Sequence, residues 1–252
     1  MIVEARPAAT VILVRDGEGE GGIETFVMCR APTMAFAPGM HVFPGGRVDP
    51  DDFAESVVFD GDDARHLAER ASTDVAGIAA LYACAVRETA EETGVVLGNR
   101  DDEGRLVIRS DVIPLADHWV TPEIEGRRYD VRFFAAELPA GQKAGLTTTE
   151  ADEAWWVRPR EALARFGHGD MPMLPPTEAT LRYLARFDAV GPMLAAAGAR
   201  PVVPLLPRRL VDEAGHVRWA MVHARTGEVI QDGISEPHTR ETDGFVVREF
   251  TL

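Results

Sequence analysis

Three glutamates and an arginine stand close together in the segment Arg87–Val95 (RETAEETGV). On a helix, at about 100° per residue, Glu88, Glu91 and Glu92 would share one arc of roughly 100°. Like charges at these spacings repel one another. Divalent cations such as Mg²⁺ or Mn²⁺ bind carboxylate oxygens and would relieve that repulsion. Because such cations bridge phosphate oxygens and activate water, the cluster indicates metal-assisted phosphate chemistry.

A helix has to position these carboxylates. Thr73 or Asp74 can cap it and Gly94 is a typical stop signal, so we expect a helix that runs to about Thr93. The alternative interpretation of the glutamates is a solvated acidic helix face. Arg87 can orient one neighbouring carboxylate through two parallel hydrogen bonds. The preceding turns predict close packing, because their residues are small or apolar: Ala79, Ala80, Ala83, Cys84 and Val86.

The segment resembles the Nudix box, which reads Gly, five residues, Glu, seven residues, then Arg-Glu-apolar-x-Glu-Glu-x-Gly-apolar. Thr89 replaces the usual aliphatic residue, and Asp52 stands where the box has its first Glu. The stretch from Gly46 to Arg87 is longer than the family spacing. The resemblance therefore implies an insertion at Asp49–Thr73, which we expect outside the core, covering or flanking a substrate cleft. The matching residues are Gly45, Gly46, Arg87, Glu88, Glu91, Glu92, Gly94 and Val95.

A second pattern lies upstream: Arg30-Ala31, seven residues, Gly39, three residues, and Phe43–Gly46 (FPGG). An ordinary strand-to-turn junction would also explain the last four residues. The pattern resembles that of coenzyme A diphosphatases within the Nudix superfamily, although Ala35 stands where they carry a second Arg. The interrupted box resembles the animal peroxisomal type. This similarity implies substrate binding by Arg30, Phe43, Gly45 and Gly46.

The resemblance implies metal-dependent hydrolysis of a nucleoside diphosphate linked to another moiety. Coenzyme A or acyl-coenzyme A is the leading substrate, and ADP-ribose, NADH or a dinucleoside polyphosphate is the alternative. Glu88 and Glu92 are the implied metal ligands, Glu91 joins the metal cluster, the Gly46 carbonyl is a further candidate ligand, and Arg87 orients the carboxylates. A non-catalytic Nudix-fold ligand sensor is the alternative of another class, and the three retained glutamates argue against it.

One further acidic residue outside the box is expected as base or metal ligand. The candidates are Glu150, Asp152 and Glu153, and Glu153 is preferred, although a solvated loop is an equal alternative for each. Aromatic residues near the expected site could stack on a base. Core packing is the more common role for such side chains. These aromatic residues are Trp119, Tyr129, Trp155 and Trp156.

The implied fold is α/β: a Nudix α/β/α sandwich with a mixed sheet, formed by residues 1–200. Residues 201–252 are expected to be a β-rich extension packed on this domain or on a partner subunit. Expected strands are Ala8–Arg15, Ile23–Arg30, Leu106–Val120, Tyr129–Leu138, Glu153–Val157, Val217–Ala224, Gly227–Gln231 and Phe245–Phe250. Expected helices are Pro159–Phe166 and Pro176–Phe187, and Ala189–Ala199 is a helix or a connector.

The composition limits the partners. The 252 residues are 46% hydrophobic and 27% charged, and the net charge is −15. A chain this acidic is a poor nucleic-acid binder, and it would repel a nucleotide unless metal cations or a local basic patch intervene. Two cysteines indicate a reducing compartment. We find no signal peptide or membrane span, so we expect a cytoplasmic protein without a membrane partner, and the resemblance makes a homodimer the favoured assembly.

Overall fold

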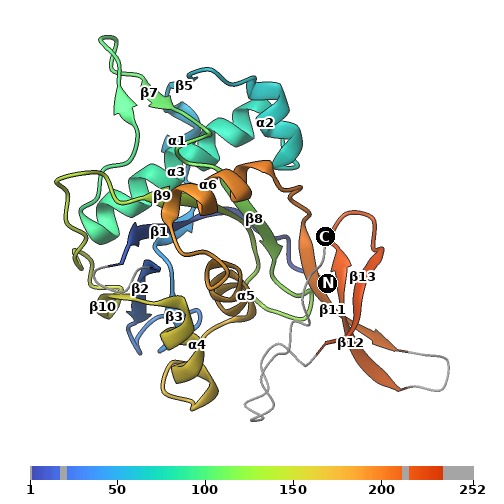
Figure 1. Cartoon of the computed structure of the whole chain (residues 1–252). Coiled ribbons are helices and arrows are strands. Elements are labelled where there is room, and N and C mark those ends of the chain that lie inside the picture. Colours follow the sequence, from blue (N-terminus) through green and yellow to red (C-terminus); the bar gives the residue numbers. More distant parts are fainter. Residues whose placement is uncertain (1, 18–21, 212–215, 235–252) are drawn as a thin grey trace.

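A mixed β-sheet forms the centre of the computed structural model, which describes residues 2–17, 22–211 and 216–234 (Figure 1). Its strands are ordered β10-β2-β1-β9-β8-β11-β12-β13, and β3 and β4 pair with β2 and β1. The bounds are β1 (Arg6–Asp16), β2 (Ile23–Arg30), β3 (His41–Val42), β4 (Gly45–Arg47), β8 (Leu115–Val120), β9 (Tyr129–Glu137), β10 (Ala151–Val157), β11 (Leu205–Val211), β12 (Val217–His223) and β13 (Val229–Ile234).

The central strand β1 is buried on both faces. It pairs antiparallel with β2, which confirms the expected hairpin, and parallel with β9. Val11 and Leu13 contribute to one hydrophobic core, and Ile12 and Val14 contribute to the core on the opposite face. Alternate residues of a strand point to opposite faces, so this apolar run serves both cores.

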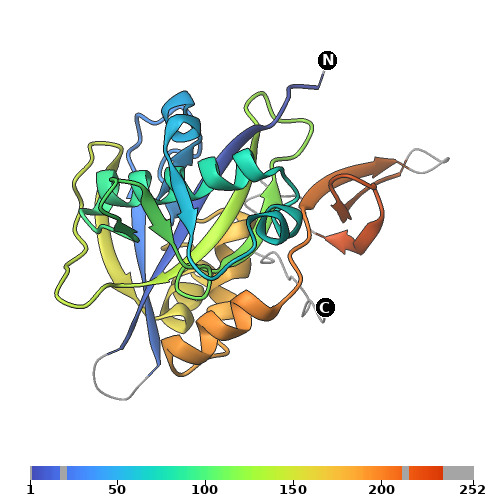
Figure 2. The same ribbon diagram turned by 90° about the horizontal axis from the view of Figure 1, so that it is seen from above.

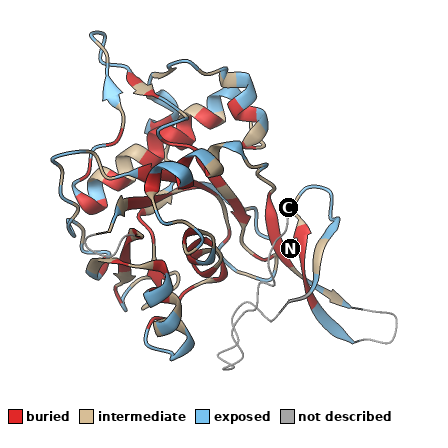
Figure 3. Ribbon diagram, in the orientation of Figure 1, coloured by how far each residue is buried: buried red, intermediate tan, exposed pale blue. Residues whose placement is uncertain are grey.

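Helices cover both faces of the sheet, as expected for an α/β/α sandwich (Figure 2). The long helix α3 (Val75–Thr93) packs on one face, with α1 (Pro50–Ala54) and α2 (Ala64–Arg70) beside it. On the other face lie α4 (Pro159–Gly167), α5 (Pro175–Leu184) and α6 (Val190–Ala199). Figure 3 shows the buried residues concentrated in α3 and the central strands.

The helix expected for the glutamates is confirmed at both ends. Asp74 accepts a hydrogen bond from the Gly77 amide at 2.7 Å, which caps the start of α3. Gly94 ends α3 with φ of 73°, a left-handed conformation that favours glycine. These two signals fix where the helix begins and ends, and hence which way its glutamates point.

The insertion at Asp49–Thr73 is only partly where the sequence predicted. It does not enter the central sheet, because its one strand, β5 (Val57–Phe59), belongs to a small sheet with β7 (Leu106–Ile108) and β6 (Asn99–Arg100). The prediction that it lies outside the core is wrong, since Leu67, Ala68 and Ala71 are buried in the core beneath α3. Apolar residues at these three positions give α2 a buried face.

The expected strand Leu106–Val120 is in fact two strands, β7 and β8, separated by residues 109–114. The extension continues the main sheet: β11 pairs parallel with β8 at Leu205 and Trp119, and β12 and β13 complete an antiparallel meander. The sequence did not predict β11, which contains Pro207, and the expected strand Phe245–Phe250 lies outside the described residues. Among the described residues, no helix is long and apolar enough to cross a membrane.

Candidate active site

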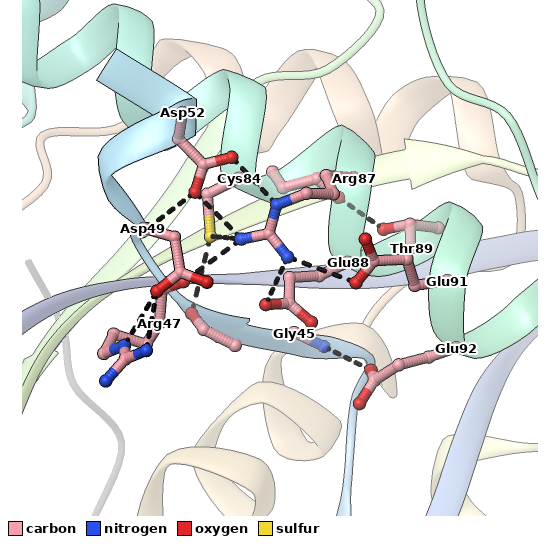
Figure 4. Close-up of polar contacts among 12 residues, drawn as sticks. Gly45, Arg47, Asp49, Asp52, Cys84, Arg87, Glu88, Thr89, Glu91 and Glu92 are labelled. Atoms are coloured by element: carbon pink, nitrogen blue, oxygen red, sulfur yellow. Dashed lines mark hydrogen bonds and ion pairs between the residues drawn. The ribbon is translucent and has the colours of Figure 1, made fainter. Parts of the chain in front are cut away.

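Arg87 stands at the centre of a carboxylate cluster on α3 (Figure 4). Its Nε and one terminal nitrogen donate to the two oxygens of Asp52, at 2.9 and 2.8 Å. The other terminal nitrogen donates to Glu88 at 2.9 Å and to Glu91 at 3.2 Å. These carboxylates raise the pKa of Arg87, with the Asp52 hydrogen bonds contributing most. The guanidinium therefore has a fixed orientation and holds Glu88 and Glu91 beside it.

Two glycines of β4 let the backbone approach this cluster closely. A Cβ on Gly46 would lie 2.2 Å from a carboxylate oxygen of Glu88. A Cβ on Gly45 would lie 2.3 Å from the Ala9 carbonyl oxygen, and the φ of this residue is 153°. The Gly45 amide donates to Glu92 at 2.8 Å. The FPGG sequence is therefore needed for contact between β4, β1 and α3, which its resemblance to a turn motif alone would not explain.

Burial and mutual repulsion disfavour the charged forms of Glu88 and Glu92. The pKa of Glu92 is raised to about 8, mainly because its carboxyl group is buried; the hydrogen bond from the Gly45 amide opposes this shift, and the charges of Glu88 and Glu150 add to it. Burial also raises the pKa of Glu88, with Glu91 and Glu150 adding to the effect against the attraction of Arg87. Desolvation disfavours a charged carboxylate, and a bound cation would favour it. This electrostatic state fits a site for a divalent cation.

A cleft of about 550 Å³ opens next to the cluster. Its floor is the sheet face opposite α3, and the N-terminal turn of α5 forms part of its wall. Seven of the residues that the sequence analysis singled out line this cleft: Arg30, Phe43, Gly45, Gly46, Arg87, Glu88 and Glu91. Glu92 is not among the lining residues, because its carboxylate is turned to the Gly45 amide behind them. The sequence-based site is thus assembled around one cavity.

The comparisons agree with this geometry. No family model matches the chain. The chain is similar to the crystal structure of a NUDIX hydrolase from Alicyclobacillus acidocaldarius, with 29% sequence identity and a TM-score of 0.61. That match covers 77% of this chain and 97% of the other.

The chain has a Nudix fold.

Two other solved structures have lower scores. The C. elegans Ap4A hydrolase binary complex has 17% identity and a TM-score of 0.37, over 76% of this chain and 93% of that one. The NUDIX domain of Shewanella oneidensis NrtR complexed with ADP ribose has 13% identity and a TM-score of 0.45, over 73% and 88%. Neither informs the chemistry of this chain. The Alicyclobacillus likeness, together with the resemblance of Arg87–Val95 to the Nudix box, supports an enzyme of the pyrophosphohydrolase type.

The oxygen donors on and beside α3 are of the kind that bind a hard cation, because they are carboxylates and a nearby backbone carbonyl. Across the part of the chain that the structure describes, however, no three side chains already converge as a metal site. Arg87 engages Glu88 and Glu91, and Glu92 engages Gly45. Metal binding would therefore require these carboxylates to exchange such hydrogen bonds for coordination.

The expected acidic residue outside the Nudix box is placed differently from our preference. Glu150 lines the cleft, whereas Glu153 does not. Glu153 lies opposite Cys29 in the pairing of β10 with β2. The Ala31 amide donates to the Glu150 carbonyl at 2.9 Å, which holds Glu150 at the strand end. A register shift in β10 between Ala151 and Glu153 decided this, and the sequence does not reveal it.

The aromatic residues divide in the same way. Trp119 and Tyr129 line the cleft. Trp155 and Trp156 do not: the Trp156 ring packs against Phe26, at 5.4 Å between centroids, and that of Trp155 against His41, at 5.4 Å. The sequence missed Arg6, which also lines the cleft and lies on β1. Its position two residues before Ala8, on the face that the cleft uses, is the only sequence signal for it.

Proposed function

We propose that this chain hydrolyses a nucleoside diphosphate linked to another moiety, in a reaction that depends on Mg²⁺ or Mn²⁺. The observation that carries the proposal is the arrangement of Glu88, Glu91 and Gly46 at the edge of one cleft, held by the Arg87–Asp52 pair. The Nudix fold and the similarity to a solved NUDIX hydrolase support the same reaction class.

Cations are needed because the cleft itself is not positive. Four arginines line it, as do five carboxylates: Asp49, Glu88, Glu91, Glu125 and Glu150. A diphosphate would meet more negative than positive side chains. Bound Mg²⁺ or Mn²⁺ would neutralise the phosphates and activate a water molecule. We assign Glu88 and Glu92 as metal ligands, with Glu91 and the Gly46 carbonyl in the same cluster.

The remaining roles belong to residues of the chain itself. Arg87 orients Glu88 and Glu91, and Asp52 holds Arg87. Arg30 donates from Nε to the Phe36 carbonyl at 3.1 Å, and its terminal nitrogens are assigned to the diphosphate. We propose Glu150 as the group that accepts a proton from the attacking water, because it lines the cleft and lies close enough to raise the pKa of both Glu88 and Glu92.

Coenzyme A or an acyl derivative is the proposed substrate. The pattern from Arg30 to Gly46 supports it, and the cleft is lined in part by apolar and aromatic side chains, among them Phe43, Trp119 and Phe133. ADP-ribose, NADH and dinucleoside polyphosphates are the competing substrates. Both cysteines are free thiols, which supports a reducing compartment such as the cytoplasm. We also propose a homodimer, in which the extension contributes to the interface.

A substrate panel tests the proposal. Purified protein with Mg²⁺ or Mn²⁺ is given coenzyme A, acetyl-coenzyme A, ADP-ribose, NADH and diadenosine tetraphosphate, and products are separated by ion-pair chromatography. We expect coenzyme A to give 4′-phosphopantetheine and adenosine 3′,5′-bisphosphate at the highest kcat/KM. Tight binding of a panel member without turnover would instead identify a ligand sensor.

A further inference from the structure

Among the residues that the structure describes, Arg6 is a cation in the cleft wall without a side-chain partner. Of the other arginines there, Arg47 pairs with Asp49 and Arg87 pairs with the carboxylates of its cluster. The fourth, Arg30, donates from Nε to the Phe36 carbonyl. Arg6 uses its backbone amide to bond the Arg128 carbonyl, at 3.0 Å. Within residues 2–17, 22–211 and 216–234, its guanidinium makes no ion pair or hydrogen bond. It is exposed, so its side chain is available to a ligand in the cleft.

The strand register places Arg6 at a defined distance from the metal cluster. Thr10 of β1 lies opposite Gly45. Arg6, Ala8 and Thr10 alternate along β1, so they share a face, and all three line the cleft. At about 3.3 Å per residue, Arg6 is roughly 13 Å from Thr10 along the strand. The cleft therefore has the carboxylate cluster beside Gly45 and Gly46 at one end and a separate cation, Arg6, toward the other.

The floor between these ends is apolar and aromatic. On β9, Phe133 lies opposite Thr10, Val131 opposite Ala8, and Tyr129 opposite Arg6. Trp119 on β8 lies beside Val131. Its indole nitrogen is a buried donor with no acceptor among the described residues. The Phe36 ring packs against Tyr129 at 5.2 Å, so an aromatic wall stands next to Arg6.

We propose that Arg6 binds a second phosphate, carried on the ribose of the substrate nucleoside. This inference rests on the proposed function. A diphosphate at the Arg30 and Glu88 end would place the base over the aromatic floor and a ribose phosphate near Arg6. Guanidinium groups bind phosphate through paired hydrogen bonds. Glu125 lines the same end, so attraction there depends on Arg6 and not on a generally positive surface. We therefore expect the enzyme to prefer nucleoside diphosphate derivatives that carry an additional phosphate on the ribose.

Two substrate pairs test Arg6, because the members of each differ only in the ribose phosphate. They are coenzyme A with 3′-dephospho-coenzyme A, and NADPH with NADH. We expect the wild-type KM to be about tenfold lower for the phosphorylated member of at least one pair. Arg6→Gln should raise that KM about tenfold and leave kcat and the other member's KM unchanged. The pair that shows the preference identifies which ribose position Arg6 reads.

The control is Arg65→Gln, which removes the same charge from the exposed face of α2, away from the cleft. It should change none of these constants. An Arg6→Gln variant that affects both members of a pair equally would overturn the inference, as would a wild-type enzyme that does not distinguish them.

A binding measurement separates failure of this inference from failure of the proposed function. If no member of either pair is hydrolysed, the proposed reaction is wrong, and calorimetric titration still tests Arg6. We expect adenosine 3′,5′- or 2′,5′-bisphosphate to bind about tenfold more tightly than adenosine 5′-monophosphate, and Arg6→Gln to abolish the difference. Equal affinities in the wild-type protein would contradict the inference.

Discussion

Asp52 and Arg87 form the most constrained contact of the candidate site. The Asp52 side chain is 3% exposed and accepts two hydrogen bonds from one guanidinium. Asp52 belongs to α1, so the Asp52–Arg87 ion pair connects α1 to α3. The interruption of the box thus comes after Asp52, which keeps the position that the family gives to a glutamate. Motif spacing alone left the role of Asp52 open.

Replacing Asp52 should destabilise the protein as well as the site. Asp52→Ala would leave the half-buried Arg87 guanidinium without its main partner and would remove a buried carboxylate that this guanidinium neutralises. We expect the free energy of unfolding to fall by about 2–3 kcal/mol. Asp111→Ala is the matched control, because its pair with Arg109 is exposed and should contribute less than about 1 kcal/mol. Urea denaturation measures both, and equal losses would show that burial of the Asp52 pair adds nothing.

Substitution of the two glycines of β4 by alanine should affect activity and stability differently. Gly46→Ala places its Cβ against Glu88, a side chain that can move, so stability should change by less than about 1 kcal/mol while turnover falls at least tenfold. Gly45→Ala meets the Ala9 backbone and should cost about 1–3 kcal/mol of stability. Thermal unfolding and turnover of both variants check this. A fully active Gly46→Ala variant would contradict the assignment of Gly46 to the metal cluster.

At the scale of the secondary-structure elements, β8 carries a buried titratable side chain where it pairs with β9. His118 is 1% exposed, and its Nε2 lies 2.5 Å from Asp130. Burial lowers the pKa of His118 despite the nearby Asp130. Below about pH 6.5 the unfolded chain binds a proton at this residue before the folded chain does. Stability attributable to His118 therefore falls as the pH decreases from 6.5.

A difference experiment isolates this contribution from other titrating groups. The free energy of unfolding of wild type and of His118→Gln is measured between pH 7.5 and 5. Relative to the variant, the wild type should lose up to about 1.4 kcal/mol per pH unit below 6.5. Asp130 does not confuse the result, because its pKa is lowered and it titrates below this window. A constant difference across the range would mean that His118 is protonated equally in both states.

Local signals predicted the elements that form the site, and pairing decided the rest. The caps Asp74 and Gly94 identified α3, and the apolar run of β1 identified the central strand. The positions of Glu150 and Glu153 depended on an irregularity in the pairing of β10 with β2. Arg6 entered the cleft because β1 extends past its apolar run. Such placements follow from register between distant strands, which no local pattern encodes.

At the scale of the whole molecule, the extension is part of the folded body. Leu205, Trp219 and Met221 are buried in the same core as Trp119 of β8. Arg208 of β11 also pairs with Glu123, at 2.8 Å. The β-rich extension expected from the sequence thus forms a meander that continues the main sheet beyond β8. The expected domain boundary between residues 200 and 201 remains a prediction.

Removing residues 201–252 should expose this core. Burial of three large apolar side chains contributes roughly 5 kcal/mol, so the truncated chain should unfold at a much lower denaturant concentration or aggregate. Arg208→Ala is the milder control and should cost less than about 1 kcal/mol. Sedimentation of the full chain and of any soluble truncation tests the proposed dimer. A truncation with unchanged stability and stoichiometry would show that the extension is an independent appendage.

The central claim is metal-dependent hydrolysis at the glutamates of α3, and one measurement tests it most directly. Turnover of coenzyme A is followed for wild type and Glu88→Gln, each with Mn²⁺ and with excess chelator. We expect cleavage only for wild type with Mn²⁺, and a loss of at least about a hundredfold in Glu88→Gln at unchanged thermal stability. Equal turnover in chelator, or near-normal turnover in Glu88→Gln, would contradict the account.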